Sequence, residues 1–338
     1  MRSPQSYCTE ALTVAALASM LAASTAFAEE QSALASGDAF VQALSRLDAD
    51  PSHNAMLGDE QPSQALHPNA QADSAASSAS RKAAAVQSIY KSATEDHDPA
   101  SMARLGALYQ EGLGVQQSYT EAIKWYTRAA EAGDTNAMNN LGSLYVAGTG
   151  LHQDFAEAMS WYRHAVDAGS VMAITNIAKL YYFGLGVERS YPEAAKQFQL
   201  ATIRGSASAM NSLGLMYDTG LGVEQNHSTA ATLIKEAARL GYGPAMANLG
   251  SMYDEGKGVE TDHVQAYAWI RAALKAGIPA DARDAIVYRL GAISTRLNSD
   301  ELAQAERMAD EIAVASRGTS PPDHSGIPTT QLNHLPAP

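Results

Sequence analysis

Residues 105–115 read LGALYQEGLGV, and close variants of this string return at residues 141–151, 213–223 and 249–259 as LGSLYVAGTGL, LGLMYDTGLGV and LGSMYDEGKGV. The spacing between successive copies is a multiple of 36 residues, and no insertion interrupts it. Every unit repeats an apolar residue, a Tyr four positions later and a Gly-x-Gly pair. A strict period of this length indicates a solenoid, in which similar supersecondary units are stacked on one another.

Each 36-residue unit predicts two helices. In the first unit, Asp98 is the expected N-cap of helix A, and Gly112 is expected to end it because glycine readily adopts the left-handed conformation. Helix B begins after Ser118, and Glu121 three residues later completes a capping box. The pattern therefore favours a helix–turn–helix unit that is repeated five times.

Helix B presents one apolar face in each unit. In the first unit this face contains Ala122, Trp125 and Tyr126, and small alanines at such positions allow helices to approach closely. We expect Trp125 and its equivalent Trp161 to be buried between neighbouring units.

The repeat divides the chain into segments of different kinds. The predicted organisation is a signal peptide (1–28), a disordered leader rich in Ala and Ser (29–80), an N-terminal capping helix (81–97), five repeats (98–133, 134–169, 170–205, 206–241 and 242–277), C-terminal capping helices (278–316, with helices at about 282–297 and 300–314) and a disordered tail (317–338). Polar capping elements are expected because an open stack would otherwise expose its apolar ends.

The N-terminus resembles a secretory signal. Arg2 precedes an apolar stretch at residues 11–23, and Ala26-Phe27-Ala28 fits the small-x-small pattern that signal peptidase accepts. We therefore expect cleavage after Ala28 and a periplasmic or secreted mature protein. The apolar stretch is shorter than the roughly 20 residues that span a bilayer. Stable membrane insertion is thus not expected after cleavage, which also removes Cys8, the only cysteine.

The repeated strings resemble Sel1-like repeats, which are relatives of the tetratricopeptide repeat, and EAIKWYTRAAEAG at 121–133 and QAYAWIRAALKAG at 265–277 reinforce the resemblance. It implies an all-α fold, a right-handed α/α superhelical solenoid whose A helices line a concave groove. Members of this family are mostly adaptors. Together with the expected signal peptide, the resemblance implies an exported scaffold that binds a peptide or protein partner in the concave groove and regulates envelope signalling or assembly.

Asparagines recur where the groove is expected. By analogy with tetratricopeptide repeats, the residue before Leu-Gly, or before Ile177-Ala178 in the third unit, faces the groove. This position selects Asn140, Asn176 and Asn248, and the preceding position adds Asn139 and Asn211. An asparagine amide can pair with both polar groups of a bound peptide backbone. An alternative is that these side chains tie adjacent helices together, and the sequence does not distinguish the two.

The third unit carries further candidates for partner binding. Lys179, Tyr182 and Phe183 fall where the groove should be, and aromatic side chains are favoured anchors at interfaces. The matching positions of later units are acidic, at Asp218, Asp254 and Glu255. This arrangement predicts an apolar centre with an exposed Tyr182, flanked by an acidic end that suits a partner with apolar and basic residues.

Signals for catalysis or for other ligands are weak. The net charge of −13 argues against nucleic acid, because binding phosphates requires clustered Lys and Arg. Ser88 and Lys91 match the serine–lysine string of penicillin-recognising enzymes, so an envelope hydrolase or penicillin-binding protein is the alternative function. His227 and His263 are equivalent residues one period apart, for which packing is favoured over metal binding. We therefore expect no enzyme activity, cofactor or metal site.

Overall fold

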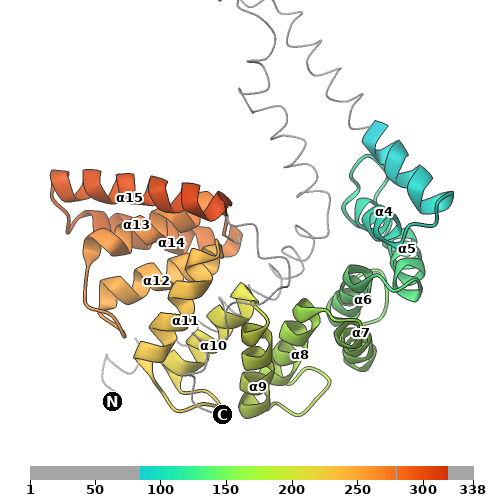
Figure 1. Ribbon diagram of the computed structural model, residues 1–338, viewed down its shortest axis with the longest axis horizontal. Helices are drawn as coiled ribbons and strands as arrows, with labels where there is room; N and C mark the ends of the chain where they lie inside the picture. The colour runs from blue at the N-terminus through green and yellow to red at the C-terminus, as the bar shows by residue number, and fades with distance from the viewer. Residues whose placement is uncertain (1–83, 279, 319–338) are drawn as a thin grey trace, which may run out of the picture. The chain divides into compact units, whose positions relative to one another are not determined.

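The computed structural model describes residues 84–278 and 280–318, and all regular structure within these residues is α-helical (Figure 1). The segments interpreted as signal peptide (1–28), leader (29–80) and nearly all of the tail (317–338) lie outside the described residues. The chain forms two compact units, which meet in sequence between Ala168 and Gly169.

The first unit contains two complete helix pairs after a helix at residues 84–94. The pairs are α4 (Pro99–Glu111) with α5 (Tyr119–Glu131), and α6 (Thr135–Ala147) with α7 (Phe155–Asp167). In addition, α5 packs against α6, so consecutive pairs are in contact.

The second unit continues the same alternation. It contains the pairs α8 (Val171–Phe183) with α9 (Tyr191–Ile203), α10 (Ala207–Thr219) with α11 (His227–Arg239) and α12 (Gly243–Glu255) with α13 (His263–Ala276), followed by α14 (Ala280–Ser294) and α15 (Ser299–Gly318). Again each helix B packs against the next helix A, as α9 does against α10 and α11 against α12. Both units thus contain stacked helix pairs.

Local signals in the sequence explain the helix ends. An Oδ atom of Asp98 accepts a hydrogen bond from the Ser101 N–H at 2.8 Å, and Ser118 Oγ accepts one from the Glu121 N–H. Gly112 ends α4 in the left-handed conformation with φ of 71°, and its N–H donates to the Leu108 carbonyl. The first glycine of each Gly-x-Gly pair therefore ends helix A as predicted.

The second glycine of the pair has another role, which the sequence does not reveal. In both units this glycine lies against an earlier helix B, as Gly150 does against Tyr119 and Gly222 against Tyr191. A Cβ atom at Gly222 would overlap the Tyr191 backbone, and φ at Gly222 is 73°. Gly114 makes the equivalent approach to Val86 in the helix at residues 84–94. These glycines therefore allow neighbouring helix pairs to pack closely.

Small residues set the distance between the two helices of a pair. The repeated alanine of helix B is fully buried in all five repeats: Ala122, Ala158, Ala194, Ala230 and Ala266. Opposite it, the glycine of Leu-Gly leaves space for a large side chain, since a Cβ at Gly106 would lie 2.7 Å from the Tyr126 ring. Tyr126 is 1% exposed. The cores of four pairs thus depend on a Gly–aromatic or Gly–Ile contact, whereas the third repeat has Ala178 in place of the glycine.

The two tryptophans differ in burial. Trp125 is 6% exposed, and Tyr90 packs edge-on against it with ring centroids 6.5 Å apart. Trp161 is only partly buried and makes an edge contact with His164 at 5.9 Å. The prediction of burial is confirmed for Trp125 and wrong for Trp161. The two tryptophans occupy the same position of the repeat, but the residues that surround them differ.

The C-terminal helices cover the last repeat. Leu290 and Ile293 of α14 and Ala305 of α15 join a core cluster with Tyr267 and Ile270 of α13. At its edge, Tyr267 donates a hydrogen bond to Glu306 at 2.7 Å. Burial, together with this bond to the carboxylate, raises the pKa of Tyr267 to about 12. Helices α14 and α15 therefore match the two helices expected at 282–297 and 300–314, although α15 extends to Gly318.

Candidate functional site

In the second unit, a row of half-buried side chains follows the A helices α8, α10 and α12. We call this row the A face, and it consists of Met172, Lys179, Phe183, Ser212, Leu215, Asn248 and Ser251. Within each helix, these residues are three, four or seven positions apart, so they share one side of it. The opposite sides are buried, with Leu213 2% and Leu249 0% exposed. The A face is therefore the part of these helices that a partner could contact.

Four of the five predicted asparagines are buried and are therefore not accessible to a partner. Asn139 and Asn176 are 1% exposed, Asn140 is 5% exposed and Asn211 is 7% exposed. Only Asn248 is partly exposed. The expectation that these amides face an open groove is thus wrong for Asn139, Asn140, Asn176 and Asn211, which are buried.

Some of the asparagine side chains form hydrogen bonds within the protein. Asn248 Nδ2 on α12 donates to Asn211 Oδ1 on α10 at 2.8 Å, which joins the A helices of two repeats. Asn139 Nδ2 donates to the Thr135 carbonyl of its own helix at 2.8 Å. The alternative in which asparagines tie helices together is therefore correct for Asn211 and Asn248.

The amide pair suggests a double-mutant test. Replacing either Asn211 or Asn248 with Ala should cost about 1–2 kcal/mol of unfolding free energy, because it removes one partner of a partly buried hydrogen bond. The double variant should cost less than the sum of the single changes, since both remove the same bond. Urea denaturation followed by circular dichroism measures this coupling. Strictly additive losses would mean that the bond does not brace the helices.

Tyr182 lies in an aromatic cluster rather than on the surface. It is 5% exposed, and its ring centroid lies 5.0 Å from that of Phe183 and 5.1 Å from that of Tyr191 on α9. Burial, with a smaller contribution from Tyr191, raises the pKa of Tyr182 to about 12. The predicted exposure of Tyr182 is therefore wrong, whereas Phe183 and Lys179 remain partly exposed on the A face.

The predicted acidic end is neutralised by ion pairs. The Asp218 carboxylate lies 2.6 Å from His227 Nδ1 and 3.8 Å from Lys257 Nζ. Lys257 also lies 3.4 Å from Glu255. These acids therefore do not form a free negative surface for a basic partner.

The acidic residues of the last repeat are also neutralised by ion pairs. The Asp254 carboxylate lies 3.2 Å from His263 Nδ1 and 2.6 Å from an Arg296 guanidinium nitrogen, and Arg289 pairs with Glu255 at 2.9 Å. The arginines come from the C-terminal cap, so these ion pairs attach the cap to the last repeat.

A signal in the sequence could have revealed these contacts. The penultimate residue of helix A and the first residue of helix B are nine positions apart, and they change together along the chain. They are Asp218 with His227 and Asp254 with His263 in the last two repeats, but Tyr182 with Tyr191 in the third. All three pairs are in contact. The two histidines thus pair with carboxylates of their own repeats.

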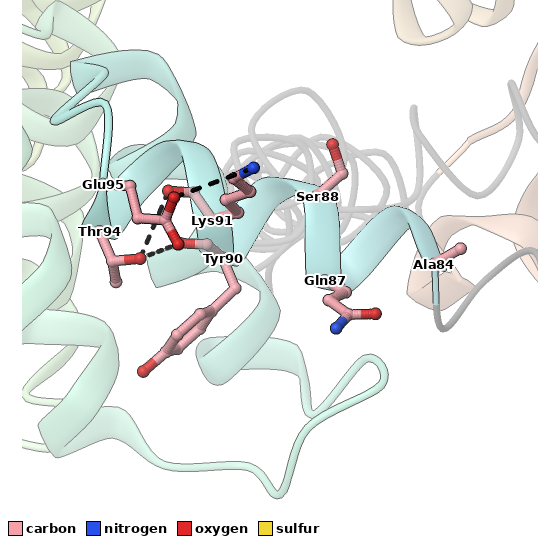
Figure 2. Close-up of a pocket in the computed structure, with 7 residues that line it drawn as sticks. All are labelled: Ala84, Gln87, Ser88, Tyr90, Lys91, Thr94 and Glu95. Carbon is pink, nitrogen blue, oxygen red and sulfur yellow. Dashed lines mark hydrogen bonds and ion pairs between the residues drawn. The ribbon is translucent and has the colours of Figure 1, made fainter.

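The Ser88–Lys91 match lies on an exposed helix. A hollow of about 440 Å³ beside this helix is lined by residues of the segment 84–95 alone. Figure 2 shows their side chains along the helix. Lys91 Nζ pairs with Glu95 Oε2 at 3.9 Å, and both side chains are more than 60% exposed. A surface lined by a single segment does not enclose a substrate, so this hollow offers no support for a serine–lysine enzyme.

Within residues 84–278 and 280–318, no group of three or more His, Cys, Asp or Glu side chains is placed to hold a metal ion. In the same part of the chain, no helix combines the length and the apolar character that crossing a bilayer requires.

Stacked pairs of short helices, with glycines at each helix A terminus and at each close approach, define an α-helical repeat protein. The Sel1 repeat family model matches residues 99–134, 135–170, 171–206, 207–242 and 243–278, which is more than half of the chain. The chain belongs to the Sel1 repeat family. Proteins of this family generally mediate protein–protein interactions, and their fold is typically a non-catalytic scaffold.

Solved structures with the same repeat are similar to this chain. A Sel1 repeat protein from Oxalobacter formigenes is 29% identical, with a TM-score of 0.55 over 68% of this chain and 99% of its own. The protective antigen c5321 of uropathogenic Escherichia coli strains, which has an SLR fold, is 25% identical with a TM-score of 0.52. That match covers 76% of this chain and 61% of the antigen. No curated protein matches the chain.

Proposed function

We propose that this protein is an interaction scaffold that binds a segment of a partner protein on the A face. The observation that carries the proposal is the row of half-buried side chains on α8, α10 and α12. Partly exposed apolar side chains can be covered by a partner without disturbing the core.

The composition of the A face favours an apolar partner segment. Met172, Phe183 and Leu215 provide apolar contact area. The hydroxyls of Ser212 and Ser251 already donate to carbonyls of their own helices, at 2.9 and 3.1 Å. These two serines therefore have few unsatisfied groups to offer, so burial of apolar surface is expected to contribute most of the affinity.

Braces beneath the A face support its use as a preformed surface. Thr175 Oγ1 and Ser206 Oγ lie 3.3 Å apart and join α8 to the start of α10, and the Asn211–Asn248 bond joins α10 to α12. A surface whose helices are already fixed loses less conformational freedom when a partner binds.

A photoreactive residue in place of Leu215 tests whether a partner binds at the A face. The matched control is the same residue in place of Leu200 on the outer side of α9, since Leu200 is 39% exposed.

We also propose that the scaffold acts in the periplasm or is secreted. The support is the Ala26-Phe27-Ala28 pattern after the apolar stretch at 11–23. We propose a role in envelope signalling or assembly, which such a location would allow.

The export proposal predicts a defined mature N-terminus. Because signal peptidase cuts after small-x-small, the protein recovered from the periplasm or medium should begin at Glu29. N-terminal sequencing or intact mass measurement distinguishes this product from the full chain. An Ala28→Arg variant is the control, since it should block processing. Soluble periplasmic protein that still begins at Met1 would contradict cleavage.

A further inference from the structure

The central part of α14 is apolar on almost every side. Residues 285–293 read AIVYRLGAI, in which Arg289 is the only charged residue. Arg289 pairs with Glu255 of α12 at 2.9 Å. A helix that is apolar all round is normally covered on more than one side, so both faces of α14 need to be accounted for.

One face of α14 packs into the fold. Leu290 is 9% exposed and Ile293 0% exposed, and both join the core cluster with Tyr267 and Ile270 of α13. This contact explains why α14 folds against the last repeat. Among the residues that the structure describes, none covers the opposite side of the helix.

The opposite face carries the α14 stripe, which we define as Asp284, Val287, Tyr288, Gly291 and Ala292. All five residues are exposed, and Tyr288 and Val287 are 82% and 49% exposed. A Cβ atom at Gly291 would meet no atom of the described residues within 4 Å, so within this part of the chain the surface beside the protruding tyrosine is open. A large aromatic side chain next to an apolar patch marks an interaction surface rather than an ordinary solvent-facing helix.

We propose that the α14 stripe binds the same stripe of a second copy of this chain, with the two α14 helices antiparallel. The order of residues is self-complementary about Leu290. Tyr288 precedes Leu290 by two positions and Ala292 follows it by two, so in an antiparallel pair each tyrosine lies over the small residues of the other copy. An isologous contact requires this kind of self-complementarity.

Charge supports the same pairing. Asp284 lies near the start of α14 and Arg296 in the turn just after its end, so an antiparallel pair brings the aspartate of each copy to the end that carries the arginine of the other. Arg296 pairs with Asp254 through one guanidinium nitrogen, yet its side chain is 49% exposed. Its remaining N–H groups can therefore donate across the contact. A parallel pair would instead place Asp284 against Asp284, which is unfavourable.

The size of the stripe limits the strength of this contact. A stable interface buries about 800 Å² on each partner, and one helix face provides less. We therefore expect a reversible dimer with a dissociation constant of about 10–100 μM, corresponding to roughly −6 kcal/mol.

Sedimentation equilibrium of the full chain over a concentration range that brackets about 10–100 μM tests the proposal. The natural chain should shift from monomer to dimer, whereas Tyr288→Asp should stay monomeric, because the buried contact would contain a carboxylate. Val314→Asp is the matched control on α15, since Val314 is also exposed, at 68%, but lies outside the stripe. It should dimerise like the natural chain. Circular dichroism checks that all variants are equally helical.

Disulfide trapping tests the antiparallel arrangement. In a Cys8→Ser background, a mixture of Tyr288→Cys and Ala292→Cys chains should form a crosslinked dimer under mild oxidation. Either variant alone should crosslink much less, because equal positions lie apart in an antiparallel pair. A natural chain that remains monomeric at every concentration, whatever else covers the stripe, overturns the proposal. So does a Tyr288→Asp variant that dimerises as well as the natural chain.

Discussion

Replacing Trp125 with Ala should lower the free energy of unfolding by about 3–5 kcal/mol, because it leaves a cavity in a closely packed region. Trp125 is 6% exposed. The Tyr90 ring packs against it, and the Arg128 guanidinium lies 5.0 Å from its centroid. The change therefore removes contacts to two helices, those at residues 84–94 and α5, and urea denaturation followed by circular dichroism measures the loss.

Trp161→Ala is the matched control for this prediction. Trp161 occupies the same position of the next repeat but is only partly buried, so its loss should cost about 1–2 kcal/mol. Repeats interact mainly with their neighbours, so the Trp125 variant should also show early loss of structure in the first unit, detectable by hydrogen exchange. Equal losses for the two variants would contradict the difference in their packing.

Replacing Gly222 with Ala should destabilise the second unit by about 3–5 kcal/mol, through a steric clash combined with backbone strain. φ at Gly222 is 73°, a conformation that L-residues rarely adopt, and the added Cβ would overlap the Tyr191 carbonyl group. Backbone atoms cannot move aside as a flexible side chain can. The loop would have to separate from the start of α9, and thermal and urea denaturation would detect this.

Gly205→Ala isolates the strain from the clash. Gly205 also has a positive φ, of 88°, but a Cβ there would lie more than 4 Å from every neighbouring atom that the structure describes. Its replacement should therefore cost about 1–2 kcal/mol, from the left-handed conformation alone. If both variants lost the same stability, the second glycine would only shape the turn and would not mediate packing between helix pairs.

Much of the fold could be predicted from the sequence because the repeat multiplies each local signal. N-caps such as Asp98 and C-terminal glycines such as Gly112 act within one turn of the chain, so they can be read without the tertiary structure. The five-fold recurrence then removes most of the ambiguity that a single copy of each signal would leave.

The candidate site was harder to predict, because accessibility depends on neighbouring helices. One position along a helix turns a side chain by about 100°, which separates the buried Tyr182 from the half-exposed Phe183. The acidic residues of the later repeats could be recognised in the sequence, but the arginines that neutralise them come from the C-terminal cap, outside the repeat. Arg296 lies 42 positions after Asp254 and beyond the last repeat. The repeat pattern therefore does not predict that the two side chains are in contact.

The proposed partner surface is tested most directly by photocrosslinking in the organism that makes the protein. A photoreactive phenylalanine analogue is placed at Leu215 on the A face, or at Leu200 on the outer side of α9, in otherwise identical chains. Both positions replace a leucine of the same unit, and both are at least partly exposed. We expect one discrete adduct, identified by mass spectrometry, from position 215 and none from position 200. That adduct should disappear when Phe183→Glu is added, provided that helicity is unchanged. Adducts of equal yield from both positions, or an adduct from position 200 alone, would contradict binding at the A face.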